Sequence, residues 1–223
     1  MSGELLDQID CLRREISQQN TVNEFLKLSL NAATVQGLLE GALTLFLSLS
    51  FLGSEKSGAA FLVNEPQPEL IMVAHHNMTE AAASWCARLP VGHCLCGRAA
   101  VTGKIHFASS MDDRHEIRRE GMEPHGHYHV PILVDGKVAG LFMLCLQQQE
   151  IQESQNPDSI KLLETVATIV AGGLKRLTVE EKIRFGEAME RMVIENTPCG
   201  IVVVGQDGII RTFNSMAERL FGP

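Results

Sequence analysis

Apolar residues at the start of the chain recur at helical spacing. Four of them follow one another at steps of four, three and four and so share one stripe of a helix: Leu5, Ile9, Leu12 and Ile16. This stripe predicts a short coiled-coil helix over residues 1–19. The helical pattern continues from residue 22 to about residue 49 and predicts two helices, with a break near Gln36-Gly37 because glycine weakens a helix.

Two pairs of short apolar runs in the middle of the chain predict β-hairpins. The first pair covers residues 59–63 and 70–74, with turn residues between them. The second pair covers residues 128–134 and 138–146 and flanks Asp135-Gly136-Lys137, where glycine suits a positive φ angle. The expected fold class is therefore α+β with an antiparallel sheet and flanking helices.

A third helical pattern begins after the second hairpin. Asn156 is a suitable N-cap, Pro157 is a suitable first helical residue, and the apolar residues that follow keep heptad-like spacing. A helix from Pro157 to about Ile194 would span on the order of 55 Å, more than one compact domain needs. We expect this helix to connect domains or to pair with a second copy; a simple packing helix is the alternative.

Length and composition describe a soluble globular protein with one full domain and a remainder. A chain of 223 residues with 45% hydrophobic and 21% charged residues fits neither the disordered nor the fibrous class. The net charge of -8 and the lack of a basic run argue against direct contact with nucleic acid, which depends on clustered Lys and Arg.

The sequence also predicts a cytoplasmic location. Charged residues interrupt the N-terminal segment, so it lacks the apolar core of a secretion signal. The most apolar window, residues 42–52, is shorter than the roughly 20 residues that span a bilayer. We therefore expect no membrane attachment in this chain, and free thiols or metal ligands rather than disulfides for its six cysteines.

Two motifs in the middle of the chain resemble those of GAF domains. Residues 91–100 read Val-Gly-His-Cys-Leu-Cys-Gly-Arg-Ala-Ala and are similar to the Gly-x-x-x-x-Gly loop that enters a helix in that family. Val130-Pro131-Ile132, followed by residues 135–140, is similar to the family's next strand and turn. With the order of the elements, the chain resembles the GAF family over residues 20–177.

The resemblance to GAF domains implies a fold, a ligand and a partner. It implies a six-stranded antiparallel sheet, one face of which holds a small molecule, while the terminal helices form a homodimer bundle on the other side. The expected organisation is an N-terminal helix over residues 1–19, a sensory domain over 20–177 and a helical linker over 178–194.

Residues 195–223 resemble the start of a PAS domain, from Glu195-Asn196-Thr197-Pro198 to Phe221-Gly222. A complete PAS fold takes about a hundred residues, so we expect two strands and a helical turn cut from a longer bacterial signalling protein. GAF followed by PAS is typical of sensor histidine kinases, diguanylate cyclases and transcriptional activators. The resemblance implies a downstream signalling domain in the parent chain and does not choose among these outputs.

Histidine and cysteine gather in one part of the sequence. All eight histidines lie between residues 75 and 129, together with three of the six cysteines. His125, His127 and His129 occupy alternate positions, so on a strand their side chains point to one face. Thiolate and imidazole together form the donor set preferred by zinc, copper or iron.

We therefore predict a metal or metal cofactor in the GAF pocket, with zinc, iron, an iron–sulfur cluster and haem left open. The candidate ligands are Cys94, Cys96, His115, His125 and His127. Three other histidines are expected to be exposed to solvent or to support the ligands: His93, His106 and His129. The alternative is that the cysteines are small buried hydrophobes and the histidines a polar rim.

A second resemblance concerns catalysis. Residues 86–90 and Cys96-Gly97 are similar to two cysteine positions of the GAF-fold free methionine sulfoxide reductases, which use an attacking and a resolving thiol. The third cysteine of that pattern is absent, since none occurs from residue 97 to 144, and the chain has neither a phosphate loop nor a GxSxG motif. We expect a sensory module without turnover. A thiol redox sensor, such a reductase, and a dimerisation module with an organic ligand are the alternatives.

Overall fold

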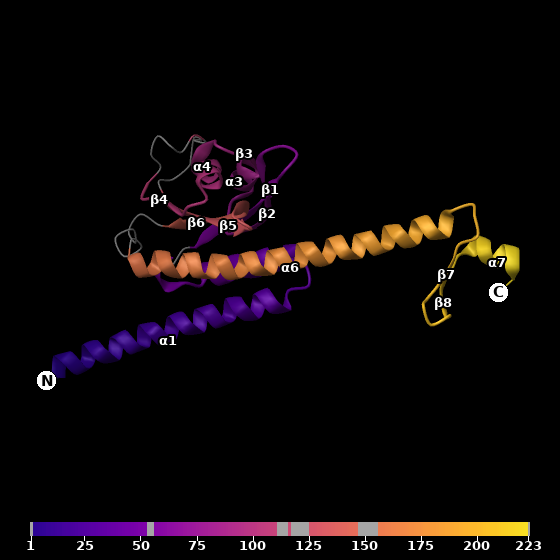
Figure 1. The fold of residues 1–223 in the computed structure, drawn as a ribbon. Coiled ribbons are helices and arrows are strands. Elements are labelled where there is room, and N and C mark those ends of the chain that lie inside the picture. The colour runs from indigo at the N-terminus through magenta and orange to yellow at the C-terminus, as the bar shows by residue number, and fades with distance from the viewer. Residues whose placement is uncertain (1, 53–55, 111–115, 117–124, 147–155, 223) are drawn as a thin grey trace. The chain divides into compact units, whose positions relative to one another are not determined.

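The structure is a computed structural model that describes residues 2–52, 56–110, 116, 125–146 and 156–222 (Figure 1). It divides into two compact units, the first ending at Arg176 and the second beginning at Leu177. Within the described ranges, no helix combines the length and apolar character needed to cross a lipid bilayer.

The N-terminal helices differ from the predicted arrangement. A single helix, α1 (Ser2–Asn31), includes both the coiled-coil stripe and the first part of the next predicted helix, and α2 (Val35–Leu47) follows. The break precedes Thr34 rather than falling at Gly37, because the Thr34 hydroxyl accepts a hydrogen bond of 3.0 Å from the Gly37 amide. A short 3-10 turn, Ser50–Leu52, ends this region.

The central sheet confirms the expected α+β class. Its six strands lie in the order β3-β2-β1-β6-β5-β4, and every neighbouring pair is antiparallel. The strands are β1 (Ser57–Asn64), β2 (Glu69–His76), β3 (Arg88–Pro90), β4 (His106–Ala108), β5 (Gly126–Val134) and β6 (Lys137–Leu146). Both predicted hairpins are present, as β1 with β2 and β5 with β6.

The turn between β5 and β6 fixes the register of the second hairpin. Asp135 and Gly136 adopt positive φ angles of 51° and 78°, which suits a two-residue hairpin turn. Further along, the pairing shifts by one residue between Ile132 and Leu133, which is a β-bulge. Gly140 follows the bulge, where any Cβ would lie 2.5 Å from the backbone oxygen of Phe61.

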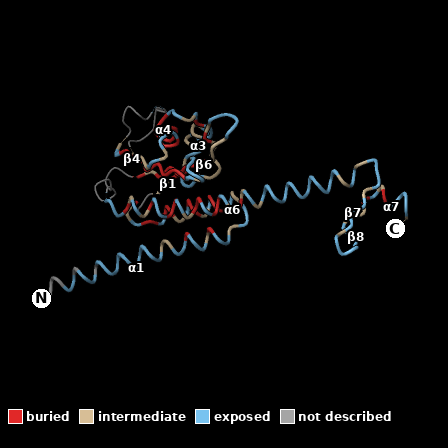
Figure 2. Tube along the Cα trace, viewed as in Figure 1, coloured by how far each residue is buried: buried red, intermediate tan, exposed pale blue. Residues whose placement is uncertain are grey.

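Helices cover one face of the sheet. Alternate residues of β6 point towards α2, and the rings of Phe142 and Phe46 lie 4.7 Å apart. The predicted long helix is confirmed as α6 (Pro157–Asn196), whose residues up to Arg176 pack beside α1. The Ser29 hydroxyl of α1 donates to the carbonyl of Ile169 at 3.0 Å. Figure 2 shows buried positions in the sheet and in the neighbouring part of α6.

The other face of the sheet is covered by shorter elements. These are α3 (Glu80–Cys86) and α4 (Cys94–Thr102), which enclose a second apolar cluster with the alternate β6 residues Leu141 and Met143. Strand β6 therefore contributes side chains to both layers of the first unit.

In the second unit, two short strands and a helix follow the C-terminal part of α6. They are β7 (Val202–Val204), β8 (Ile210–Phe213) and α7 (Ser215–Phe221), and β7 and β8 pair antiparallel. Asn214, which is fully buried, joins these elements by four side-chain hydrogen bonds.

Candidate functional site

Sulfur-containing side chains concentrate on the sheet face that packs against α4. The buried core there includes Cys96 and Met143. Four more sulfur side chains pack against it: Met72, Met78, Cys86 and Cys145. Because thioethers and thiols are soft donors, this face is chemically distinct from the aromatic and aliphatic layer under α2.

Three potential metal ligands converge at the edge of this sulfur-rich layer. One nitrogen each from His125 and His127 and the sulfur of Cys145 all lie within 4.8 Å of one another. The Cys145 Sγ is 3.8 Å from His127 Nδ1, and the two imidazole rings are 4.3 Å apart. Among the described residues, this is the one group of three or more His, Cys, Asp or Glu that could hold an ion.

The register of the β5–β6 hairpin produces this convergence. His127 and Cys145 are direct cross-strand partners, so their side chains share one face of the sheet. Counting back from the turn without the bulge would instead pair His127 with Leu144 and turn Cys145 to the opposite face. The sequence analysis missed Cys145 because nothing in the sequence marks that extra residue.

Two further histidines continue the donor-rich face. His129, only 1% exposed, has its ring 5.3 Å from that of His127 and is the cross-strand partner of His106 on β4. Burial excludes solvent exposure for His129, one of its two expected roles, and leaves support of the ligands as a prediction. His93 is exposed, as expected.

The predicted ligands Cys94 and Cys96 are not members of this group. Both are buried in the first turn of α4, and neither belongs to the cluster of converging donor atoms. Cys96 instead forms part of the apolar core. The assignment of both as ligands stays a prediction, and the fifth candidate, His115, lies outside the described residues.

Burial keeps the thiols on this face protonated. It raises the pKa of Cys145 to about 11, against a smaller opposite effect of a hydrogen bond with Ser57. Burial, with Cys94 and then Cys145 nearby, raises the pKa of Cys86 from 9.0 to about 11. The pKa of Cys96 is well above its ordinary value for the same main reason. An ion that binds Cys145 must therefore displace a proton.

Glu116 forms hydrogen bonds at the N-terminal end of α4. Its carboxylate accepts hydrogen bonds from Arg98 at 2.9 Å and from the Cys94 amide at 3.1 Å, and lies 3.3 Å from His93 Nδ1. The Arg98 guanidinium, then the Cys94 amide, lower the pKa of Glu116. This contact fixes Cys94, whose φ of 55° is unusual for a residue with a side chain.

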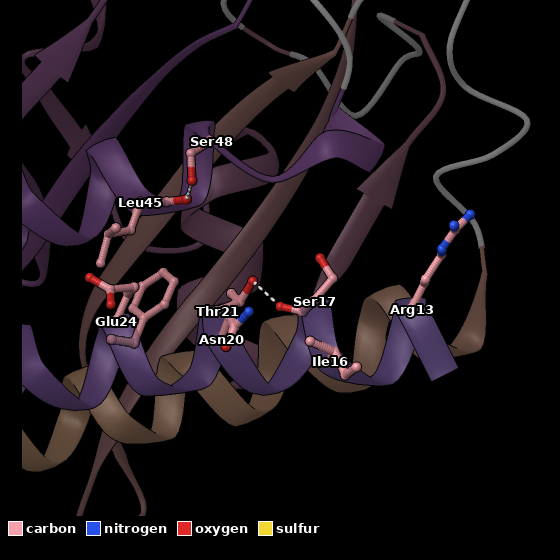
Figure 3. A pocket seen from close by; sticks show the side chains of 9 residues that line it. Arg13, Ile16, Ser17, Asn20, Thr21, Glu24, Leu45 and Ser48 are labelled. Carbon is pink, nitrogen blue, oxygen red and sulfur yellow. Dashed lines mark hydrogen bonds between the residues drawn. The ribbon is translucent and has the colours of Figure 1, made fainter. Parts of the chain in front are cut away.

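A separate groove of about 390 Å³ lies between α1 and α2 (Figure 3). Within it, the Thr21 hydroxyl donates to the Ser17 carbonyl at 3.0 Å. Its lining comprises Arg13, Ile16, Ser17, Asn20, Thr21, Glu24, Phe25, Leu45 and Ser48. These side chains include neither histidine nor cysteine, so the groove is distinct from the donor cluster.

A six-stranded antiparallel sheet, with helices on one face and a donor-rich layer on the other, places the first unit among compact α+β domains. Residues 32–175 match the GAF domain family, and the chain belongs to this family. The matched range begins at the end of α1, twelve residues after the boundary expected from the sequence. No curated protein sequence matches the chain significantly.

Solved structures of similar fold include proteins of the following two kinds. The GAF domain of a phosphoenolpyruvate-protein phosphotransferase from Coxiella burnetii has a TM-score of 0.62 and 14% identity, covering 75% of this chain and 98% of that one. The GAF domain of the Acinetobacter phosphotransferase has a TM-score of 0.60 and 13% identity, covering 73% and 95%.

The second kind is enzymatic. The free methionine-R-sulfoxide reductase of Neisseria meningitidis, solved in complex with its substrate, has a TM-score of 0.58 and 14% identity, covering 73% of this chain and 91% of that one. At these identities the likeness establishes a shared fold alone. Function must be argued from the residues of this chain.

Proposed function

We propose that the GAF domain is the sensory input domain of a signal-transduction protein and that it senses a metal ion bound by His125, His127 and Cys145. The observation that carries this proposal is the approach of their three donor atoms to within 4.8 Å. They come from neighbouring strands and a strand end, so the sheet holds them together without an ion.

The donor geometry suits a single metal ion. With metal–nitrogen distances of about 2.0 to 2.1 Å and a metal–sulfur distance of about 2.3 Å, the sulfur and nitrogen ligands of one ion lie about 3.5 to 3.8 Å apart. The Cys145 Sγ to His127 Nδ1 distance of 3.8 Å already fits that range. An iron–sulfur cluster fits less well, because it takes four cysteines or two cysteines and two histidines.

Strand β6 offers a route from the ion to the helices. A ligand shifts an equilibrium only by its differential affinity for two states. Ligation would fix Cys145 beside His127 and restrain β6, whose next residues on the opposite face include Phe142, packed on Phe46 of α2. The ion would thereby favour one packing of the sheet against α2, and α2 lies beside α1 and α6.

We further propose that the signal is read by a homodimer formed through the terminal helices. Along α1 the stripe of Leu5, Ile9, Leu12 and Ile16 is exposed in the single chain. An isolated helix with an exposed apolar stripe is only marginally stable in water, and a second copy would cover the stripe with its own.

The second unit fits the start of a PAS domain, which we propose precedes a downstream signalling domain in the parent protein. It contains the expected strand, turn, strand and helix in that order, and Asn214 accepts hydrogen bonds from the amides of Ile201 and Ala217. The parent's output, whether histidine kinase, diguanylate cyclase or transcriptional activator, would be identified from its complete coding sequence.

Thiol chemistry is the second candidate function. Its supporting observation is that Cys86 and Cys96 share one core cluster in a fold also used by free methionine sulfoxide reductases. The raised pKa of Cys86, about 11 and caused first by burial, opposes it, because the thiolate is the nucleophile. Thiol-dependent reduction of free methionine sulfoxide that is lost in Cys96→Ser would favour this reading.

Elemental analysis of the chain, purified without a polyhistidine tag under anaerobic conditions, tests the metal proposal. We expect close to one equivalent of metal in the wild type and in Cys11→Ser, whose thiol is exposed and remote in sequence. Cys145→Ser and His127→Asn should each retain little. Metal well below one equivalent in the wild type, even after incubation with Zn(II), Fe(II) and Cu(I), would favour an organic ligand or a pure dimerisation module.

A further inference from the structure

We propose that the site formed by His125, His127 and Cys145 selects a soft monovalent ion, Cu(I), over divalent zinc or iron. This inference rests on the proposed function, because it assigns the ion to the same three residues. It draws on the charge of the donor group, the number of donors and the sulfur atoms around them.

Charge balance favours a monovalent ion. The donor group contains one thiol and two imidazoles and no carboxylate. After the thiol loses its proton, the three ligands carry one negative charge, so a monovalent ion gives a neutral complex and a divalent ion leaves one positive charge. His127 is 2% exposed, and a net charge at such a position costs free energy unless a counter-charge accompanies it.

The number of converging donors points the same way. Structural zinc sites take four protein ligands, and a zinc site with three protein ligands keeps a water in the fourth position. The described residues bring three donor atoms together, and trigonal His₂Cys is a donor set that proteins use for copper.

The surroundings add a soft donor. Met143 lies two residues before Cys145 on the same face of β6, is 5% exposed, and is the cross-strand partner of His129. A thioether is a soft ligand that favours Cu(I) and contributes little to zinc binding. Met72 and Met78 pack against the same core cluster.

Competition between the two ions in the whole chain tests this inference. The reduced protein is titrated anaerobically with Cu(I) buffered by bicinchoninate, and separately with Zn(II) buffered by a chromophoric chelator. We expect one equivalent of Cu(I), with a near-ultraviolet thiolate band, and Cu(I) occupancy when both ions are buffered at the same free concentration. Cys145→Ser should weaken Cu(I) binding by at least about a hundredfold. This is more than the loss of a residue that only hydrogen-bonds to a metal ligand would cause.

Two variants serve as controls for the ligand set. Cys86→Ser removes a thiol of the same core cluster that lies outside the donor group, and it should bind Cu(I) as the wild type does. Met143→Leu keeps the side-chain volume but removes the thioether, and it should weaken Cu(I) about tenfold while leaving Zn(II) affinity unchanged.

A measurement on the wild type covers the case in which Cys145→Ser does not fold. Alkylation followed by peptide mass spectrometry should show that Cys145 is modified more slowly with Cu(I) than in the metal-free protein, whereas Cys11 is modified equally in both. Zn(II) occupancy at equal free concentrations, or alkylation of Cys145 at the same rate with and without Cu(I), would overturn the choice of ion. Stoichiometric Zn(II) at Cys145 would leave the proposed metal sensor intact, whereas failure of every ion to bind would overturn both.

Discussion

At the scale of single residues, burial governs what the cysteines can do. Burial raises the pKa of three of the six, Cys86, Cys96 and Cys145, so their environment holds the proton on the sulfur rather than releasing it. This suits a thiol that reacts only when a metal replaces its proton. It does not suit a nucleophile that must be ionised at neutral pH.

The Cys86 thiol predicts a loss of stability at alkaline pH. Its pKa is raised from 9.0 to about 11 on folding, first by burial, so the folded state binds the proton more tightly. The resulting stabilisation is complete below pH 9 and disappears as the pH rises towards 11. We expect the melting temperature to fall across this window, and to fall less in Cys86→Ser than in the control Cys11→Ser. Parallel curves for all three proteins would contradict this assignment.

Asn214 predicts a local loss of stability in the second unit. Its side-chain oxygen accepts from the amides of Ile201 and Ala217, and its nitrogen donates to the carbonyls of Ile194 and Cys199. Asn214→Ala should destabilise this unit by about 2 kcal/mol or more, because buried backbone groups lose their partners.

Hydrogen exchange measures the effect of Asn214 directly. The amides of Ile201 and Ala217 should exchange faster in Asn214→Ala, while those of the GAF domain remain protected. Asn214→Asp keeps the accepting oxygens but sets a buried carboxylate oxygen against the carbonyls of Ile194 and Cys199, so it should destabilise the unit at least as much as Asn214→Ala. Unchanged protection of both amides in Asn214→Ala would show that the side chain is dispensable.

At the scale of elements, the features that could be predicted from the sequence are those that neighbouring residues determine, such as turns, helix caps and helical spacing. The β5–β6 hairpin was predictable because Asp135-Gly136 specifies the turn, and α6 was predictable from its N-cap and spacing. The start of α2 was misplaced because Gly37 weakens a helix, whereas Thr34 caps one three residues earlier. The pair His125 and His127 followed from alternation on a strand, but Cys145 required the register of a partner strand.

The exposed stripe of α1 predicts how the chain associates. Leu12 is 56% exposed, and a charge at this position in a helix pair would be placed against the apolar stripe of the second copy. We expect light scattering to give a dimer for the wild type and a monomer for Leu12→Lys. Gln18→Lys adds the same charge away from the stripe and should remain dimeric. A monomeric wild type at high micromolar concentration would exclude this interface.

At the scale of the whole GAF domain, the sheet separates two chemical layers and β6 contacts both. Met143 and Cys145 face the sulfur-rich layer, while Phe142 and Leu144 face the helices. No contact between an ion and a helix is needed for one to influence the other. A stiff β6 can transmit the restraint from the ion on one face of the sheet to the helices on the other.

This arrangement predicts that metal binding changes hydrogen exchange on the sheet face that the helices cover. Binding should slow hydrogen exchange in α2 as well as in β5 and β6, because the restrained strand carries Phe142 against Phe46. Phe142→Leu should bind metal with unchanged affinity but show a smaller response in α2. Leu133→Ala, altered at an exposed position on β5, serves as the control. An equal α2 response in Phe142→Leu would exclude this route.

The bulge near Ala139 makes the domain more vulnerable to a change of length than to a change of residue. A substitution in β6 alters one contact, but insertion of a further residue before Gly140 would invert the strand beyond it. The aromatic residues would then meet the sulfur layer, and the thiol would meet the helices. During divergence of this lineage, an insertion between His127 and Cys145 should therefore be selected against more strongly than a substitution of one of the residues between them.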